Sequence, residues 1–209
     1  IDLRLGQRAR QQLQRQEHAA ALQPALTRDG WRIEVSANVA SLSETEQAMA
    51  SGGAGVGLLR SEFLYLGRNH APSHDEQVAT YSAIARTIGP AHNLVVRTLD
   101  VGGDKPLAYV PMDSETNPFL GLRGIRLCLE RPELLREQLR AILASAGLAR
   151  LHIMLPMVSL LSELHLARQE LTFRVQALRR IGQGRRLDRA GGQLPQPASR
   201  IDGSNPAVA

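Results

Sequence analysis

The chain has 209 residues, of which 43% are hydrophobic, 22% charged and 3% aromatic, with one Cys and a formal net charge of +5. This length suffices for one sizeable domain, and a single Cys excludes an intramolecular disulfide framework. The longest nearly apolar stretch, residues 151–161, is shorter than the roughly 20 residues that span a bilayer. Together with the lack of a secretory signal pattern, this predicts a cytoplasmic protein without a membrane span.

Most of the positive charge lies near the C-terminus. Residues 1–178 contain 19 basic and 18 acidic residues, net +1, whereas residues 179–209 contain six Arg and two Asp, net +4. This tail has neither dense Lys and Arg runs nor interleaved aromatic residues, so it does not indicate nucleic-acid binding. Its richness in Gly, Arg, Gln and Pro predicts that residues 179–209 are disordered.

The remaining chain is predicted to alternate between helices and strands. Residues 1–26 have helical spacing and predict an exposed connector helix. A strand over 31–39 and a helix over 41–50 follow, and Ser41 and Glu44 have the spacing of a capping box. The later strands are expected at 55–59, 93–101 and 150–158, and the later helices at 75–88, 132–146 and 162–179.

This alternation indicates parallel βαβ units, because parallel neighbours need a crossover between them. About four such units are predicted within residues 27–178. A doubly wound sheet and a (β/α) barrel fit this pattern equally well.

Three arginines follow or end predicted strands or lie in a glycine-rich loop, namely Arg60, Arg97 and Arg123. Parallel α/β folds place their chemistry at the carboxyl ends of strands. A guanidinium group is a rigid fork of donors that matches phosphate and carboxylate, so converging arginines suit a compact polyanion. Taken alone, each arginine is more often an ordinary surface or ion-paired residue than a ligand-binding one.

Other residues give weaker signals. The glycines from Gly53 to Gly57 lack the dinucleotide-binding spacing, which favours close backbone packing instead. The turn from Asp100 to Lys105 suits either an anion site or an Asp-stabilised turn. Cys128 lies in an apolar stretch and is expected to be a buried, inert thiol. The six His are scattered and predict no metal site.

Four long segments resemble enzyme I of the bacterial phosphoenolpyruvate:sugar phosphotransferase system, including the versions fused into multiphosphoryl transfer proteins. They are Gly55-Val-Gly-Leu-Leu-Arg-Ser-Glu-Phe-Leu64, Val96-Arg-Thr-Leu-Asp-Val-Gly-Gly-Asp-Lys-Pro106, Asn117-Pro-Phe-Leu-Gly-Leu-Arg-Gly-Ile-Arg126 and Ile153-Met-Leu-Pro-Met157. The likeness covers roughly residues 1–172. It implies a (β/α)8 TIM-type barrel, of which residues 27–178 would form the N-terminal half.

The resemblance implies that Arg60, Arg97 and Arg123 bind phosphoenolpyruvate. In that family the phosphoryl group passes to a histidine on a separate domain and then to a small phosphocarrier protein during sugar uptake. Mg²⁺ takes part in that family, and a homodimer is a candidate assembly for this chain.

Several motifs of the family are not found in this sequence. The phosphoacceptor histidine, the acidic residues that bind Mg²⁺ and the catalytic acid Cys would all lie outside this chain, and Cys128 lies in the wrong region for that role. We therefore expect a truncated fragment that binds substrate but is inactive alone. The alternative is a non-catalytic module for anion binding or self-association, since half barrels expose sheet edges and apolar surface.

Overall fold

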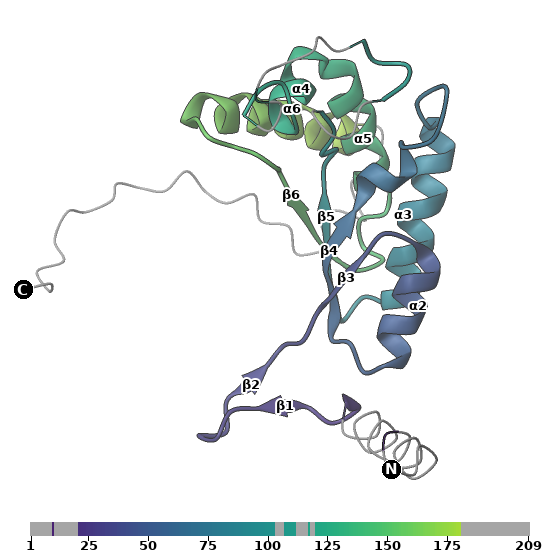
Figure 1. Ribbon diagram of the computed structural model, residues 1–209, viewed down its shortest axis with the longest axis vertical. Helices are drawn as coiled ribbons and strands as arrows, with labels where there is room; N and C mark the ends of the chain where they lie inside the picture. Colours follow the sequence, from purple (N-terminus) through teal and green to yellow (C-terminus); the bar gives the residue numbers. More distant parts are fainter. Residues whose placement is uncertain (1–9, 11–20, 103–106, 112–116, 118–119, 181–209) are drawn as a thin grey trace, which may run out of the picture.

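The computed structural model describes residue 10 and residues 21–102, 107–111, 117 and 120–180, with the side chains of 179 and 180 excepted. Within them, four parallel strands form one sheet in the order β3-β4-β5-β6 (Figure 1). These strands are β3 (Ala37–Val39), β4 (Gly55–Arg60), β5 (Asn93–Arg97) and β6 (Arg150–Met154). The parallel α/β architecture predicted from the alternating pattern is confirmed.

Each strand leads into a helix. Helices α2 (Leu42–Ala50), α3 (His74–Ile88) and α5 (Pro132–Ala144) lie along one face of the sheet, and α6 (Leu161–Arg180) follows β6 (Figure 1). Two short helices, η1 (Ser61–Leu64) and α4 (Ile125–Glu130), lie beyond the carboxyl ends of β4 and β5. Helix α4 was not predicted, because six residues are too few to establish a helical period.

Local capping determines where the crossover helices begin. The Ser41 hydroxyl accepts a hydrogen bond from the Glu44 N–H at 3.2 Å, as the sequence predicted for α2. Helix α3 begins with a complete capping box between Ser73 and Glu76, and α5 begins at Pro132, where a missing N–H costs nothing. These helices therefore begin close to the predicted residues.

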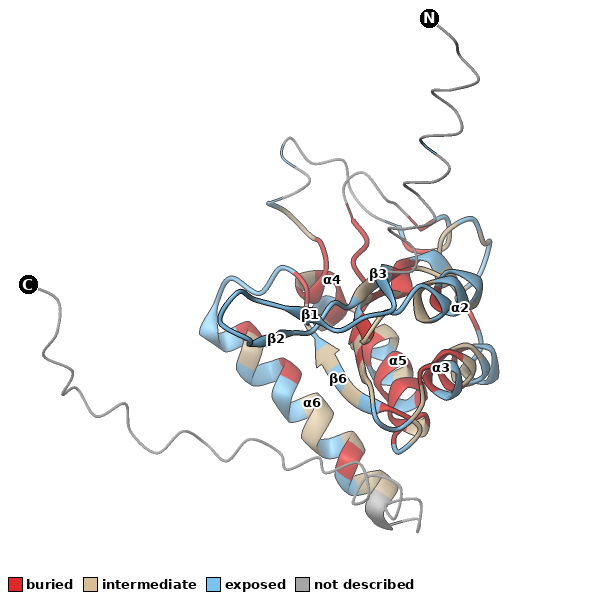
Figure 2. Cartoon of the chain, turned by 90° about the horizontal axis from the view of Figure 1, so that it is seen from below, coloured by how far each residue is buried: buried red, intermediate tan, exposed pale blue. Residues whose placement is uncertain are grey.

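The main core lies between the sheet and the helices. Val56, Leu94 and Val96 of the sheet are fully buried and belong to one apolar cluster with Tyr81 and Ile84 of α3. Figure 2 shows buried residues concentrated in α3 and α5, whereas α6 is mostly exposed or half-buried. Strand β6 alternates between exposed and half-buried residues, so the described part of the chain leaves one face of this strand uncovered.

The amino-terminal part differs from the prediction. The strand expected over 31–39 is divided: Arg32–Ile33 forms β2, which pairs antiparallel with β1 (Ala25–Leu26), and only Ala37–Val39 joins the main sheet. A turn closed by the Thr27 N–H and the Trp31 carbonyl at 2.8 Å produces this hairpin. The predicted connector helix cannot reach residue 26, because β1 occupies 25–26. Most of that helix lies outside the described residues, as does the tail from 181 to 209.

Two strands end earlier than predicted. Strand β5 ends at Arg97 rather than 101, and β6 ends at Met154 rather than 158. Beyond β6, Pro156 lacks an N–H for the sheet and Met157 adopts a positive φ of 63°, so the chain leaves the strand conformation. None of the helices in the described part of the chain is long and apolar enough to cross a membrane.

Candidate functional site

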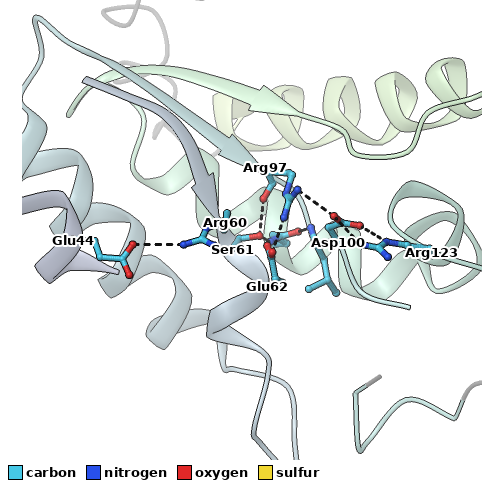
Figure 3. Close-up of polar contacts among 9 residues, drawn as sticks. Glu44, Arg60, Ser61, Glu62, Arg97, Asp100 and Arg123 are labelled. Carbon is cyan, nitrogen blue, oxygen red and sulfur yellow. Dashed lines mark hydrogen bonds and ion pairs between the residues drawn. The ribbon is translucent and has the colours of Figure 1, made fainter. Parts of the chain in front are cut away.

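The carboxyl ends of β4 and β5 bring two of the predicted arginines together. Arg60 and Arg97 are the last residues of their strands and are paired in register in the parallel sheet. Arg123 lies on the loop that precedes α4, and its side chain points toward the same end of the sheet (Figure 3). The three residues therefore lie in one row above the strand ends.

Two buried carboxylates hold Arg97 and Arg123. The Arg97 guanidinium contacts Glu62 through Nη2 at 2.5 Å and Asp100 through Nη1 at 3.1 Å. Asp100 also accepts from Arg123, whose Nε lies 3.0 Å from Asp100 Oδ1 (Figure 3). Glu62 is 0% exposed in its side chain and Asp100 only 6%. We call Glu62, Arg97, Asp100 and Arg123 the inner cluster.

Arg60 has a more open environment. Its Nη2 lies 3.7 Å from Glu44 Oε2, and the two side chains are 34% and 47% exposed. The guanidinium carbon also lies 4.8 Å from the centre of the Phe63 ring, a cation–π geometry. Glu44 Oε2 also accepts from the Ala40 N–H at 2.8 Å. We call Arg60 and Glu44 the outer pair.

A glycine permits the close approach that places Arg123. Gly102 has a φ of +123°, and a Cβ atom at this position would lie 2.4 Å from the Leu122 carbonyl oxygen and 2.9 Å from the Arg123 Cα. Only glycine fits both the conformation and the space. The chain after β5 can therefore lie directly against the backbone of Arg123.

Buried hydrogen bonds join η1 to the end of β5. The Ser61 hydroxyl donates to the Arg97 carbonyl at 2.6 Å and accepts from Gln138 Nε2 at 2.9 Å. Gln138 Oε1 in turn accepts from the Leu99 N–H at 2.8 Å, and Nε2 also lies 3.2 Å from the Tyr81 hydroxyl. Burial raises the pKa of Tyr81 to about 12, so the phenol remains neutral. Helix α5 thus braces both strand ends that carry Arg60 and Arg97.

Glu44 and Glu62 belong to this site but were not predicted from the sequence as part of it. Glu62 carries a local signal, since it is an acidic residue two positions after Arg60 in an otherwise apolar segment. Its partner Arg97 is 35 residues away in sequence, so the contact depends on the register of the sheet. The formal charges of these six side chains, three arginines and three carboxylates, cancel. An incoming anion would therefore compete with carboxylates for the arginines.

The other residues that the sequence singled out have structural rather than chemical roles where the structure describes them. Cys128 is buried, as expected from the sequence, and this burial raises the pKa of its thiol to about 12. A Cβ at Gly55 would lie 2.6 Å from the Asn93 carbonyl oxygen, which confirms close backbone packing. Lys105 lies outside the described residues. Among those that are described, no group of three or more His, Cys, Asp or Glu is placed to hold a metal ion.

A wide hollow of about 1070 Å³ lies at the opposite end of the sheet. The hairpin residues Arg32 and Glu34 and the residues Ala37, His92 and Arg150 at the amino ends of the strands line it. It has none of the three arginines that follow β4 and β5. Chemistry in parallel α/β folds belongs to the carboxyl ends of the strands, so we assign the candidate site to the arginine row rather than to this hollow.

The sequence of the chain is similar to a protein family and to several known proteins. The family described as PEP-utilising enzyme, PEP-binding domain, matches residues 14–191. A phosphoenolpyruvate-protein phosphotransferase of Geobacillus stearothermophilus is 43% identical over 176 residues, which is 84% of this chain and 30% of that protein. A multiphosphoryl transfer protein of Rhodobacter capsulatus is 47% identical over 146 residues, 70% of this chain and 18% of that protein.

A phosphoenolpyruvate-protein phosphotransferase of Bacillus subtilis is 41% identical over 161 residues, covering 77% of this chain and 28% of that protein. The chain therefore spans less than a third of the curated relatives described here. Its matched region includes both strand ends and the loop that carry the three arginines. The chain belongs to the family of PEP-utilising enzymes, as a member of their PEP-binding domain.

Proposed function

We propose that this chain supplies the phosphoenolpyruvate-binding part of a phosphoenolpyruvate-dependent protein phosphotransferase. In this proposal Arg60, Arg97 and Arg123 bind the ligand. Phosphoenolpyruvate carries a phosphate and a carboxylate as substituents of the same carbon atom, and neighbouring guanidinium groups match both anions. The names of the relatives support this substrate and a protein acceptor.

The in-register pairing of Arg60 with Arg97 is the observation on which the proposal rests. It puts two guanidinium groups on adjacent strands, and Asp100 links the second of them to Arg123. The Nε atoms of Arg60 and Arg97 form no hydrogen bond within the described part of the chain. Both Nε atoms are buried, whereas the Arg60 and Arg97 side chains as a whole are 34% and 17% exposed, so a ligand would meet the exposed part of each guanidinium group rather than its Nε.

Phosphoryl transfer depends mainly on positioning and on stabilising charge. In the proposed role the arginines orient phosphoenolpyruvate and offset the charge on its phosphoryl oxygens. The phosphoryl group would then pass to a histidine and on to a phosphocarrier protein in the cytoplasm, for sugar uptake. The described residues offer no ligand set for the Mg²⁺ that the resemblance implies, so we derive no step through it.

We further propose that the four parallel strands form one half of a (β/α)8 barrel. The sheet has helices on one face, as barrel strands do, and its other face includes the exposed residues Asn38, His152 and Met154. Strand β6 pairs with β5 on one side and with no other described strand. Further parallel strands added beside β6 would extend the sheet, and closure of the sheet into a barrel would enclose this face.

Titration of the full chain with phosphoenolpyruvate in a calorimeter tests the substrate assignment. We expect Arg97→Ala to abolish measurable binding, because it removes a guanidinium from the centre of the arginine row. Arg136→Ala is the matched control, since Arg136 pairs with Glu170 between α5 and α6 and is not part of the row. Equal affinity in the parental chain and Arg97→Ala would refute the assignment.

Exposed apolar residues on α6 favour association with a second copy as an additional property. Leu161, Leu166 and Phe173 are 67%, 50% and 58% exposed. Leu166 and Phe173 are two helical turns apart and therefore share a face of α6, and exposed apolar surface of this kind favours association. Light scattering after size-exclusion chromatography tests this property: we expect a dimer that Phe173→Glu converts to a monomer, and a monomeric parental chain would contradict it.

A further inference from the structure

Glu62 is a charged side chain with no exposure to solvent, at the centre of the candidate site. It lies in η1, two residues after Arg60, and contacts Arg97 Nη2 at 2.5 Å across the two strand ends. A carboxylate is costly to bury unless strong hydrogen bonds offset the loss of water. Its location so close to two candidate ligand-binding arginines therefore calls for a specific role.

The surroundings of Glu62 hold its backbone in place independently of the ion pair. The adjacent Ser61 hydroxyl donates to the Arg97 carbonyl at 2.6 Å and is itself held by Gln138. The η1 turn is thus attached to the end of β5 by uncharged hydrogen bonds. Because the turn is held in this way, the length of the Glu62 side chain sets where its carboxylate meets Arg97.

Arg97 is held from two sides. Glu62 contacts Nη2, and Asp100 contacts Nη1 at 3.1 Å. Rotation of the guanidinium about its Nε–Cζ bond would break both contacts. Each Nη carries two hydrogens, so one remains on each nitrogen after these contacts are made. The two carboxylates therefore define the plane in which the remaining donors lie.

We infer that Glu62 is a positioning residue: it holds the Arg97 guanidinium in the orientation that receives the anionic ligand. This inference rests on the proposed phosphoenolpyruvate site and adds the residue that orients its central arginine. Glu62 itself does not touch the ligand in this role. Preorganisation of this kind lowers the entropy lost when an anion binds.

Two opposing substitutions separate positioning from simple charge neutralisation. Glu62→Asp keeps the charge and withdraws the carboxylate by one methylene, whereas Glu62→Gln keeps the reach and removes the charge. If Glu62 only neutralised Arg97, Glu62→Gln would strengthen anion binding and Glu62→Asp would leave it unchanged. If Glu62 orients Arg97, Glu62→Asp weakens binding and Glu62→Gln does not strengthen it.

The first readout is phosphoenolpyruvate affinity of the full chain, with folding of each variant checked by circular dichroism. We expect Glu62→Asp to weaken binding about tenfold or more, comparable to losing one charge-assisted hydrogen bond. Glu170→Asp, which shortens a carboxylate paired with Arg136 away from the site, is the matched control and should leave affinity unchanged. Affinity of Glu62→Asp within threefold of the parental chain, or tighter binding by Glu62→Gln, overturns the inference.

The second readout does not depend on ligand. Nitrogen-15 NMR of the arginine side chains, assigned with Arg97→Lys, reports rotation about the Arg97 Nε–Cζ bond. We expect separate Nη signals in the parental chain and averaged signals in Glu62→Asp. Unchanged signals in Glu62→Asp overturn the inference. If the parental chain binds no phosphoenolpyruvate, the proposed function fails, and this signal alone decides whether Glu62 orients Arg97.

Discussion

The outer pair and the inner cluster have the same kinds of groups in different environments. Arg60 and Arg97 end adjacent strands in register, yet Arg60 faces a carboxylate that is 47% exposed, whereas Arg97 faces carboxylates that are 0% and 6% exposed. The Arg60–Glu44 separation of 3.7 Å also exceeds hydrogen-bond length, unlike the contacts of Arg97. The two arginines are therefore restrained to different degrees.

This difference shows that the burial of the paired carboxylate determines how firmly an arginine is held in position for a ligand. A buried carboxylate cannot be left without a partner, so Arg97 and Arg123 keep their places whether or not a ligand is bound. An arginine can move away from a solvent-exposed carboxylate at little cost, because water then hydrates the carboxylate in its place. We expect the inner cluster to supply geometry and Arg60 to adjust its position to the anion.

Asp100→Ala tests the inner side of this comparison and should have the largest effect on stability. It removes the carboxylate shared by Arg97 and Arg123, and loss of one partner from a buried ion pair costs about 3–5 kcal/mol. Urea unfolding followed by circular dichroism measures this loss. Trp31 fluorescence would be a poor reporter, because that side chain lies in the hairpin and is 73% exposed.

Glu170→Ala is the control for Asp100→Ala. Glu170 pairs with Arg136 at 2.7 Å, but the Arg136 side chain is 45% exposed, so this loss should remain below about 1 kcal/mol. If both substitutions lower the free energy of unfolding equally, burial does not distinguish the inner cluster from a surface ion pair.

Gln138→Leu should have an intermediate effect. The substitution keeps the side chain's approximate volume but removes the acceptor of the Leu99 N–H and the donor to Ser61. Leaving buried polar groups without partners costs about 1–3 kcal/mol. The same unfolding measurement should therefore show a loss smaller than that of Asp100→Ala. A stabilised variant would show that this network does not hold the strand ends.

The parts of the fold that could be predicted are those set by short stretches of sequence. Ser41, Ser73 and Pro132 begin their helices through contacts within a few residues, so the helix starts were predicted closely. Arg60 could be placed at a strand end because apolar residues precede it directly, whereas the strand that carries Arg97 was predicted to continue to residue 101. Their alignment with each other is a property of the sheet register.

The parts that could not be predicted depend on residues far apart in sequence. Alternation over 31–39 does not say which sheet each residue joins, and the segment divides between a hairpin and the main sheet. The Glu62–Arg97 contact spans 35 residues, and nothing near either residue identifies its partner. Carboxylates that hold ligand-binding arginines therefore become visible only once the strands are paired.

Glu44→Gln tests the outer side of the comparison and should have the smallest effect. Gln can still accept from the Ala40 N–H, so α2 keeps its amino-terminal hydrogen bond. Two charges near 4 Å attract by only about 1 kcal/mol in water, and salt reduces this further. Removing a competing carboxylate should thus tighten phosphoenolpyruvate binding by about two- to fivefold at low salt, with little change in stability. The sign of the change in affinity is the decisive result, because Glu62→Asp is expected to weaken binding.

Weaker binding by Glu44→Gln would contradict this prediction. Glu44 would then hold Arg60 in place as Glu62 holds Arg97, and the outer pair would have the same function as the inner cluster despite its exposure.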